Sequence, residues 1–352
     1  MLEGNHPERP GARPWLRVVI RAALFLLVLF GVTAAWLADY AWRPAPGTGQ
    51  QAVVLIPRGA SLAEIGRLLV LSGHIRMDRR FLPVALLGGY RGRLPAGEFS
   101  LATGQSPLAV LEGLATARPL LHPVTIPEGL RAEEIAEIFA TGGWCDRRSF
   151  TSLVGDRTFI TRLGYADLQS LEGYLYPDTY LFTRDFRGAE KIITLMVERF
   201  GAVWRQLSED LPEPADREKT VILASIVEKE AATAEERPII AGVFLNRLRL
   251  GMRLQADPTV VYGLEEFTGP ITKAQLRTPT PYNTYLLAGL PAGPISNPGR
   301  DALAAVLQPA ETESLYFVAK NDGTHHFSAT LAEHNRAVQK YQRKNAPEKG
   351  KQ

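Results

Sequence analysis

Thiols and histidines are scarce in this chain: its 352 residues include one cysteine, Cys145, and six histidines. A single thiol excludes an internal disulfide and any structural zinc site that needs several cysteines. The histidines form no HExxH-type pair, so neither a metal ion nor another cofactor is expected. No histidine or cation stands beside Cys145 within Gly142–Asp146. We therefore expect an inert, partly buried thiol.

An excess of charge of one sign is also missing. The chain has 40 Lys and Arg against 37 Asp and Glu, a formal net charge of +3. Nucleic-acid binding needs a clustered excess of cations that displaces counterions from phosphates, so nucleic acid is not an expected partner. Neither a GxGxxG nor a P-loop pattern is found, which argues against a nucleotide-dependent enzyme.

Near the N-terminus, Ala22–Ala38 is an uncharged apolar run, which Val18–Ile20 extend if Arg21 snorkels. Aromatic rings suited to a membrane interface stand toward its two ends: Trp15 before it, and Trp36, Tyr40 and Trp42 at the other end. Four arginines precede it, at positions 9, 13, 17 and 21. The positive-inside rule therefore predicts a cytoplasmic N-terminus (1–21), a membrane anchor (22–42) and a remainder outside the cytoplasm.

A cleaved signal peptide is the alternative for the same segment, because both begin with basic residues and an apolar stretch. The apolar run is longer than a typical signal-peptide core. No clean small-x-small cleavage site follows it. These two features favour an uncleaved anchor.

A strand–turn–helix pattern follows a linker-like segment at 43–50. Residues 52–56 favour a strand, and Ser61 can cap a helix with an apolar stripe at Leu62, Ile65, Leu68 and Leu69. A weak copy recurs in Ile126–Ile135, which suggests related α/β modules. The first copy resembles a LysM-like glycan-binding module, assigned to 50–122. A plain packing domain is the alternative.

Longer helical patterns begin after residue 123. Periodicity predicts helices at 130–140, 188–208, 216–236, 238–249 and about 301–308, and a strand at 315–319. The fold class is therefore α+β, with a larger mixed α/β domain at 123–340. The basic segment 341–352 has almost no apolar residue and is predicted to be a frayed tail.

The helix that starts near Glu218 is the most informative one for chemistry. Ile222, Leu223, Ile226 and Val227 share one face, and Glu230 continues it, whereas Glu228 projects to the far side. A carboxyl group on an apolar face is desolvated, which raises its pKa and suits a general acid. The alternative is that the helix ends earlier and leaves Glu230 in solvent.

Polar, aromatic-bearing segments lie downstream of this helix. Gln255, Asp257 and Thr259 alternate with small or apolar residues, and Pro258 prevents a continuous helix. Two Pro-rich loops follow, at 278–285 and 289–299. Hydroxyl, amide and aromatic groups of this kind suit a sugar chain, whose hydroxyls need hydrogen bonds and whose faces stack on rings. Turn formation alone would also explain each loop.

Several long, ordered motifs together resemble the endolytic murein transglycosylases, the YceG-like family. They are LEGYLYPDTY at 171–180, ASIVEKE at 224–230, NRL at 246–248 with MRLQADPTV at 252–260, YNTY at 282–285 and GLP at 289–291. His325-His326-Phe327 also stands near a family His-x-Phe.

The resemblance implies a single-pass inner-membrane protein whose LysM-like and catalytic domains face the periplasm. It would cut the β-1,4 bond between N-acetylmuramic acid and N-acetylglucosamine in nascent peptidoglycan, next to the peptidoglycan synthases. It places the catalytic acid on Glu230. Residues expected to bind substrate are Glu228, Asn246, Gln255, Asp257, Thr259, Tyr282 and Asn283.

A lytic transglycosylase needs only one carboxyl group, because the muramyl C6 hydroxyl, and not water, attacks C1. Two alternatives stay open. A hydrolase would need a second group to activate water, and Glu172, Asp178 or Asp257 would supply it. A non-catalytic, membrane-tethered peptidoglycan-binding scaffold would use the same polar loops.

Overall fold

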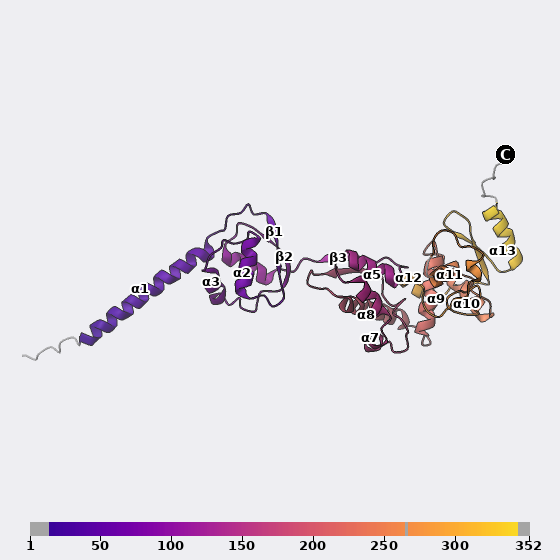
Figure 1. The fold of residues 1–352 in the computed structure, drawn as a ribbon, viewed down its shortest axis with the longest axis horizontal. Helices are drawn as coiled ribbons and strands as arrows, with labels where there is room; N and C mark the ends of the chain where they lie inside the picture. Colours follow the sequence, from indigo (N-terminus) through magenta and orange to yellow (C-terminus); the bar gives the residue numbers. More distant parts are fainter. Residues whose placement is uncertain (1–13, 265–266, 344–352) are drawn as a thin grey trace, which may run out of the picture. The chain divides into compact units, whose positions relative to one another are not determined.

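The computed structural model describes residues 14–264 and 267–343 (Figure 1). The chain divides into two compact units. Unit 1 comprises Met1–His122 with Thr183–Asp185, and unit 2 comprises Pro123–Phe182 with Phe186–Gln352. Helices and three two-stranded sheets make up the described residues, so the α+β class is confirmed. The LysM-like nature of 50–122 and the catalytic nature of 123–340 stay predictions.

Unit 1 is a small α/β module at the end of a long helix. Its elements are α1 (Pro14–Trp42), β1 (Gln51–Ile56), α2 (Leu62–Leu71), α3 (Phe81–Leu87), β2 (Gly97–Ala102) and α4 (Pro107–Thr116). Strands β1 and β2 pair antiparallel, with Gln51 opposite Ala102 and Ile56 opposite Gly97. Alternate strand side chains, including Val54, Ile56 and Phe99, enter a core shared with α2, α3 and α4.

Helix α1 contains a segment, Trp15–Trp42, that is long and apolar enough to cross a membrane. At about 1.5 Å per residue it extends about 42 Å, more than the roughly 30 Å of a hydrocarbon core. Its last turn is not available to contact lipid, because Tyr40 and Ala41 are buried in the core of unit 1. The helix therefore enters the module directly.

The predicted linker at 43–50 is packed against unit 1. Ala45 is buried, and its N–H donates to Gln105 O at 3.0 Å. Gly47 lies so close to the backbone of Gly104 that a Cβ at position 47 would lie 2.3 Å from Gly104 N. This segment is therefore not a spacer.

Unit 2 is built around α9 (Arg217–Glu230), which contacts α10 (Arg237–Arg249), α11 (Asp257–Gly263) and α12 (Arg300–Leu307). The other elements are β3 (His122–Thr125), α5 (Ala132–Thr141), α6 (Arg147–Val154), α7 (Arg157–Arg162), β4 (Thr179–Phe182), α8 (Ala189–Ser208), η1 (Gln275–Arg277), β5 (Tyr316–Ala319), β6 (His325–Ser328), α13 (Leu331–Val338) and η2 (Gln339–Arg343). Strand β3 pairs with β4, and β5 pairs antiparallel with β6.

The two strand–turn–helix copies have matching local geometry. Gly59 and Gly129 both adopt positive φ, 78° and 75°, in the turn between strand and helix. The isoleucines that flank each turn, Ile56 with Ile65 and Ile126 with Ile135, are buried in the core of their own unit. The repeated residues therefore encode the same turn twice.

Helix α9 differs from the predicted helix in length and in burial. It ends at Glu230, not at residue 236, and every residue from Thr220 to Val227 is buried. The chain reverses after Glu230, since Arg237 returns to within 3.2 Å of Glu228 and starts a new helix, with Pro238 in its first turn. The single-face argument was therefore wrong in detail, because residues 220–227 of α9 are surrounded by protein on all sides.

One prediction was confirmed and another needed correction. Pro258 does prevent a continuous helix: residues 252–256 are not helical, and α11 begins only at Asp257, with Pro258 in its first turn, where its missing N–H has no intrahelical partner to lose. Residues 341–343 belong to η2 and not to a frayed tail, and Tyr341 O accepts a hydrogen bond from Asn321 at 3.0 Å. The rest of the predicted tail, 344–352, lies outside the described residues.

Candidate active site

Glu230, the last residue of α9, lines a cavity of about 480 Å³ in unit 2. Gln255 and Asp257 line the same cavity, so the structure brings together three of the eight predicted site residues. Other lining residues come from α10, the 282–285 loop, β5 and α13: Arg247, Tyr285, Tyr316, Phe317 and His334. The cavity therefore combines acidic, amide and aromatic groups.

The Glu230 carboxyl is only partly open to solvent. Burial is the main cause that raises its pKa from 4.5 to about 7, and the nearby negative charge of Asp257 adds to this effect. The positive charge of Arg247 acts in the opposite direction. Near neutral pH a substantial share of Glu230 side chains is protonated, as a general acid requires.

Asp257 is exposed and is held in place by Tyr285, whose hydroxyl donates to Asp257 Oδ1 at 2.5 Å. Gln255 is exposed and adopts a positive φ of 50°, which is uncommon for a residue other than glycine. Its backbone N–H donates to Thr284 O at 3.2 Å. The 255–257 segment is thus fixed against the 282–285 loop, with both polar side chains available to a ligand.

Arg247 organises the segments around the cavity. Its guanidinium donates to Leu315 O at 2.6 Å and to Leu254 O at 2.7 Å, and it lies over the Tyr316 ring at 5.3 Å. Arg247 is buried on α10, and burial lowers its pKa. This one side chain therefore connects α10, the 253–254 segment and the start of β5.

Three other predicted site residues form hydrogen bonds with the protein backbone through their side chains. The Asn283 side chain is fully buried, donates to Leu276 O and Thr278 O, and accepts from the Tyr285 N–H. Thr259 is also buried and donates to Ala256 O at 2.6 Å. Asn246 donates to Thr312 O at 2.7 Å. These contacts assign the three side chains to loop structure.

The remaining two predicted site residues, Glu228 and Tyr282, do not line the Glu230 cavity. The Glu228 carboxylate accepts from Arg237 Nη2 at 3.2 Å and from the Gly299 N–H at 3.1 Å, and only 6% of its side chain is exposed. Tyr282 packs edge-on against Tyr262, with ring centroids 4.6 Å apart. Glu228 therefore joins α9 to α12, and Tyr282 belongs to a neighbouring surface.

His325 is a site residue that was not assigned from the sequence, although its motif was noticed. It lines the Glu230 cavity, and its backbone N–H and Nδ1 both contact the Glu236 carboxylate, at 2.6 and 2.8 Å. A carboxylate only accepts hydrogen bonds, so Nδ1 carries the proton. Tyr285 and Arg247 were quoted within motifs, but spacing alone does not bring them to Glu230.

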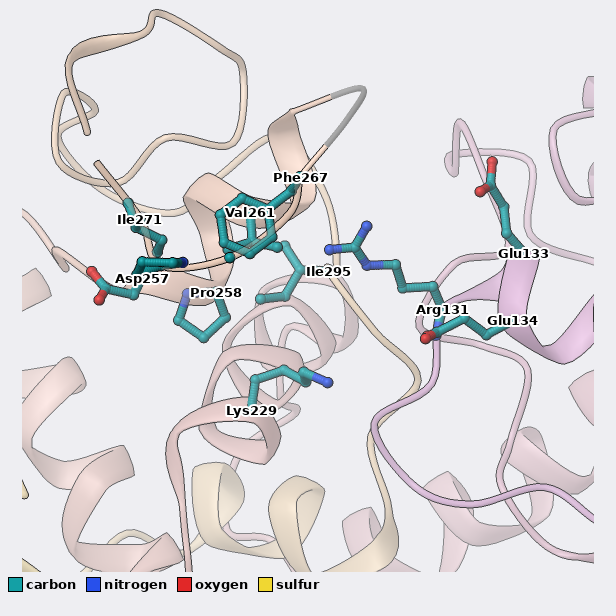
Figure 2. A pocket seen from close by; sticks show the side chains of 12 residues that line it. Arg131, Glu133, Glu134, Lys229, Asp257, Pro258, Val261, Phe267, Ile271 and Ile295 are labelled. Atoms are coloured by element: carbon teal, nitrogen blue, oxygen red, sulfur yellow. The ribbon is translucent and has the colours of Figure 1, made fainter. Parts of the chain in front are cut away.

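A second cavity of about 530 Å³ shares Asp257 with the first (Figure 2). Arg131 extends into it from the start of α5 toward Val261, Phe267 and Ile295. A third, of about 490 Å³, shares Arg131 and contains Tyr262, Tyr282 and Glu172. Shared lining residues thus connect three cavities along unit 2.

Of the three acidic residues considered as a second carboxyl group, only Asp257 lines the Glu230 cavity. Burial raises the pKa of Glu172 to about 7, but its oxygens accept from Ala132 N, Tyr262 Oη and Asn297 Nδ2 in the third cavity. Asp178 forms an ion pair with Arg199 at 2.7 Å.

Cys145 is partly buried, and burial raises its pKa to about 11, so the thiol is protonated at neutral pH. Across residues 14–264 and 267–343, no group of three or more His, Cys, Asp or Glu side chains is placed to hold a metal ion.

Comparisons with known proteins give consistent similarities. The model of the YceG-like family matches residues 54–340. An endolytic murein transglycosylase of Bacillus subtilis is 33% identical over 301 residues, covering 81% of this chain and 83% of that protein. One from Streptococcus pneumoniae D39 is 30% identical over 318 residues, covering 80% and 57%. A YceG-like crystal structure from Listeria monocytogenes has a TM-score of 0.56 at 32% identity, covering 82% of this chain and 99% of that one.

Proposed function

The chain belongs to the YceG-like family, and from this premise we propose that it is an endolytic murein transglycosylase. It would cleave the β-1,4 bond between N-acetylmuramic acid and N-acetylglucosamine within nascent peptidoglycan strands, leave 1,6-anhydromuramyl ends and so terminate glycan elongation. The observation that carries the proposal is the desolvated Glu230 carboxyl in a polar, aromatic-lined cavity.

Glu230 acts twice in this mechanism. Its proton passes to the glycosidic oxygen as the bond from C1 to that oxygen breaks, and the oxygen keeps the bonding electrons. The muramyl C6 hydroxyl oxygen then bonds to C1, and its proton passes to the Glu230 carboxylate, which restores the acid. Nucleophile and electrophile belong to one sugar, which gives a high effective concentration and makes water unnecessary.

Neighbouring side chains support the charge changes of this reaction. The Asp257 carboxylate lines the same cavity and stabilises positive charge that develops at C1. Tyr285 holds Asp257 through its hydroxyl. The exposed Gln255 amide is suited to sugar hydroxyls. Asn246, Thr259 and Asn283 position these groups through the loop backbone.

Cleavage inside a strand requires sugar units to be bound on both sides of the broken bond. The second cavity continues from Asp257 and supplies Arg131 and Lys229 beside Val261 and Ile295. We assign it to sugar units on one side of Glu230. The third cavity, with Tyr262 and Tyr282, extends the path with aromatic rings.

Helix α1 is the proposed single-pass inner-membrane anchor, with residues 1–21 cytoplasmic and the rest periplasmic. Its length and composition support this assignment. The arginines at 17 and 21 near its start support the orientation. Residues 50–122 are the proposed LysM-like module. A position beside the membrane would place the enzyme next to the peptidoglycan synthases.

A hydrolase with Asp257 as the water-activating base is the second candidate, because two carboxyl groups line one cavity. The test is mass spectrometry of glycan strands after incubation with the full-length protein in detergent. The transglycosylase gives anhydro ends that are one water lighter than hydrolysis products.

The Glu230→Gln variant tests the acid directly. It keeps the shape of the side chain but has no carboxyl proton, so anhydro products are expected to disappear. Glu228→Gln is the matched control, since Glu228 lies outside the cavity and should leave the product type unchanged. Anhydro fragments from Glu230→Gln at the parental rate would exclude Glu230 as the acid. Strand binding without any cleavage by the parent protein would favour the scaffold.

A further inference from the structure

Five large apolar side chains are exposed within a short stretch of unit 1. Leu71, Met77 and Leu87 are 83%, 81% and 78% exposed, and Leu82 and Leu86 of α3 are 40% and 47% exposed. Single exposed apolar residues are common on protein surfaces, but a concentration of them marks an interaction site. We call the stretch Leu71–Arg93 the basic-apolar segment.

The same segment has an excess of positive charge. Arg76, Arg79, Arg91 and Arg93 are exposed, and none of them has an ion-pair partner within residues 14–264 and 267–343. Its single acidic residue, Asp78, is paired with Arg80 at 2.8 Å. Four guanidinium groups are therefore available to bind anions.

Part of the basic-apolar segment, helix α3 with Arg79 and Arg80, lies beside the end of the proposed membrane helix. Helix α3 contacts α1 within unit 1, as Figure 1 shows. Arg80 Nη1 donates to Trp36 O at 2.9 Å, and the Arg79 guanidinium lies over the Trp36 ring at 5.7 Å. Tryptophan favours the membrane–water interface, so a Trp36 ring at that depth brings both arginines to the lipid headgroups.

A direct junction between helix and module makes this placement rigid. Tyr40 and Ala41 of α1 are buried in the core of unit 1, and the following segment is bonded to it through the Ala45 N–H. Unit 1 cannot swing away from the bilayer on a flexible linker.

We propose that the basic-apolar segment binds anionic phospholipid headgroups at the outer surface of the membrane that α1 crosses. Guanidinium groups bind phosphate oxygens through two parallel hydrogen bonds, and leucine side chains enter the boundary between headgroups and acyl chains. Each arginine at an anionic surface strengthens the contact about fivefold. The inference rests on the proposed membrane anchoring and extends it to the module itself.

The test uses the full-length protein in nanodiscs, with an environment-sensitive fluorophore on single cysteines in a Cys145→Ser background. Probes at Leu86→Cys and Leu87→Cys report the basic-apolar segment, and nitroxide-labelled lipids report proximity by quenching. Ala63→Cys is the matched exposed control, because it lies in the first turn of α2, about 12 Å along that helix from Leu71. Val32→Cys reports the anchor.

We expect quenching at positions 86 and 87 in discs with phosphatidylglycerol, weaker quenching with phosphatidylcholine alone, and none at position 63. Changing Arg76, Arg79, Arg91 and Arg93 to glutamine should abolish the quenching at positions 86 and 87. The same change at four exposed arginines of unit 2 should leave that quenching unchanged; these are Arg147, Arg148, Arg162 and Arg205.

Several results would overturn the inference. Quenching at 86 and 87 that is no stronger than at 63 excludes lipid contact and leaves a protein or glycan partner for the surface. Equal quenching in both lipids excludes recognition of anionic headgroups. If position 32 is not quenched by deep nitroxides, the anchor itself fails. Quenching at 32 alone contradicts only the surface contact.

Discussion

The raised pKa of Glu230 has a measurable cost in stability. A carboxyl whose pKa rises from 4.5 to about 7 disfavours ionisation in the folded protein by about 3 kcal/mol, at about 1.4 kcal/mol per pKa unit. The folded protein holds this proton up to about pH 7, whereas the unfolded chain releases it near pH 4.5. Glu230 therefore lowers stability as the pH rises through this window.

Glu230→Gln removes the ionisable group and keeps the size of the side chain. We expect the variant to match the parent within about 1 kcal/mol at pH 4 and to be more stable by about 2–3 kcal/mol at pH 8. Partial solvent access to Glu230 keeps the gain below the full value. For a unit of this size, that gain raises the melting temperature by about 5–10 °C.

Differential scanning calorimetry of the full-length protein in detergent at both pH values measures this difference. Glu228→Gln is the control and should change the stability in the opposite direction. It breaks the buried ion pair with Arg237 and should destabilise the folded protein by about 1–3 kcal/mol at pH 8. The reasoning is refuted if Glu230→Gln melts at or below the parental temperature at pH 8, or if its gain is the same at pH 4.

Three other changes test the surroundings of Glu230. The activity of the parent should fall as the pH rises above about 7, because the proton donor is lost; a rate that keeps rising to pH 9 would contradict this. Asn283→Ala leaves loop groups without partners and should cost about 2–3 kcal/mol in calorimetry, with reduced activity; an unchanged melting temperature would contradict this role. Tyr285→Phe removes the hydroxyl that holds Asp257, so kcat should fall while the melting temperature moves by less than about 3 °C; parental kcat would exclude Tyr285 as a positioning residue.

The fold was predictable where local chemistry decides the structure. Ser61 caps α2 through a bond from the Glu64 N–H, and Gly59 supplies the positive φ of the turn. The strong periodicity of α8 gave its bounds to within a residue. The end of α9 was not predictable from propensity, because the return of Arg237 to Glu228 is a tertiary contact.

The candidate site was predictable only in part, for a related reason. Sequence indicates which residue types suit a sugar but not where their polar atoms point. Asn283 and Gln255 were equivalent as amide-bearing loop residues, yet the first is fully buried and bonded to backbone and the second is exposed in the cavity. Arg247 and His325 line the Glu230 cavity from segments that only the folded chain brings together.

The position of Glu230 at the carboxyl end of a 14-residue helix has a consequence for engineering. That end carries the partial negative pole of the helix dipole, where a lysine is favourable and an anion is not. Random screens for thermal tolerance should therefore recover neutral or basic replacements at this position, all of them inactive. Replacing Glu230 is therefore expected to raise thermal stability and to abolish catalysis at the same time.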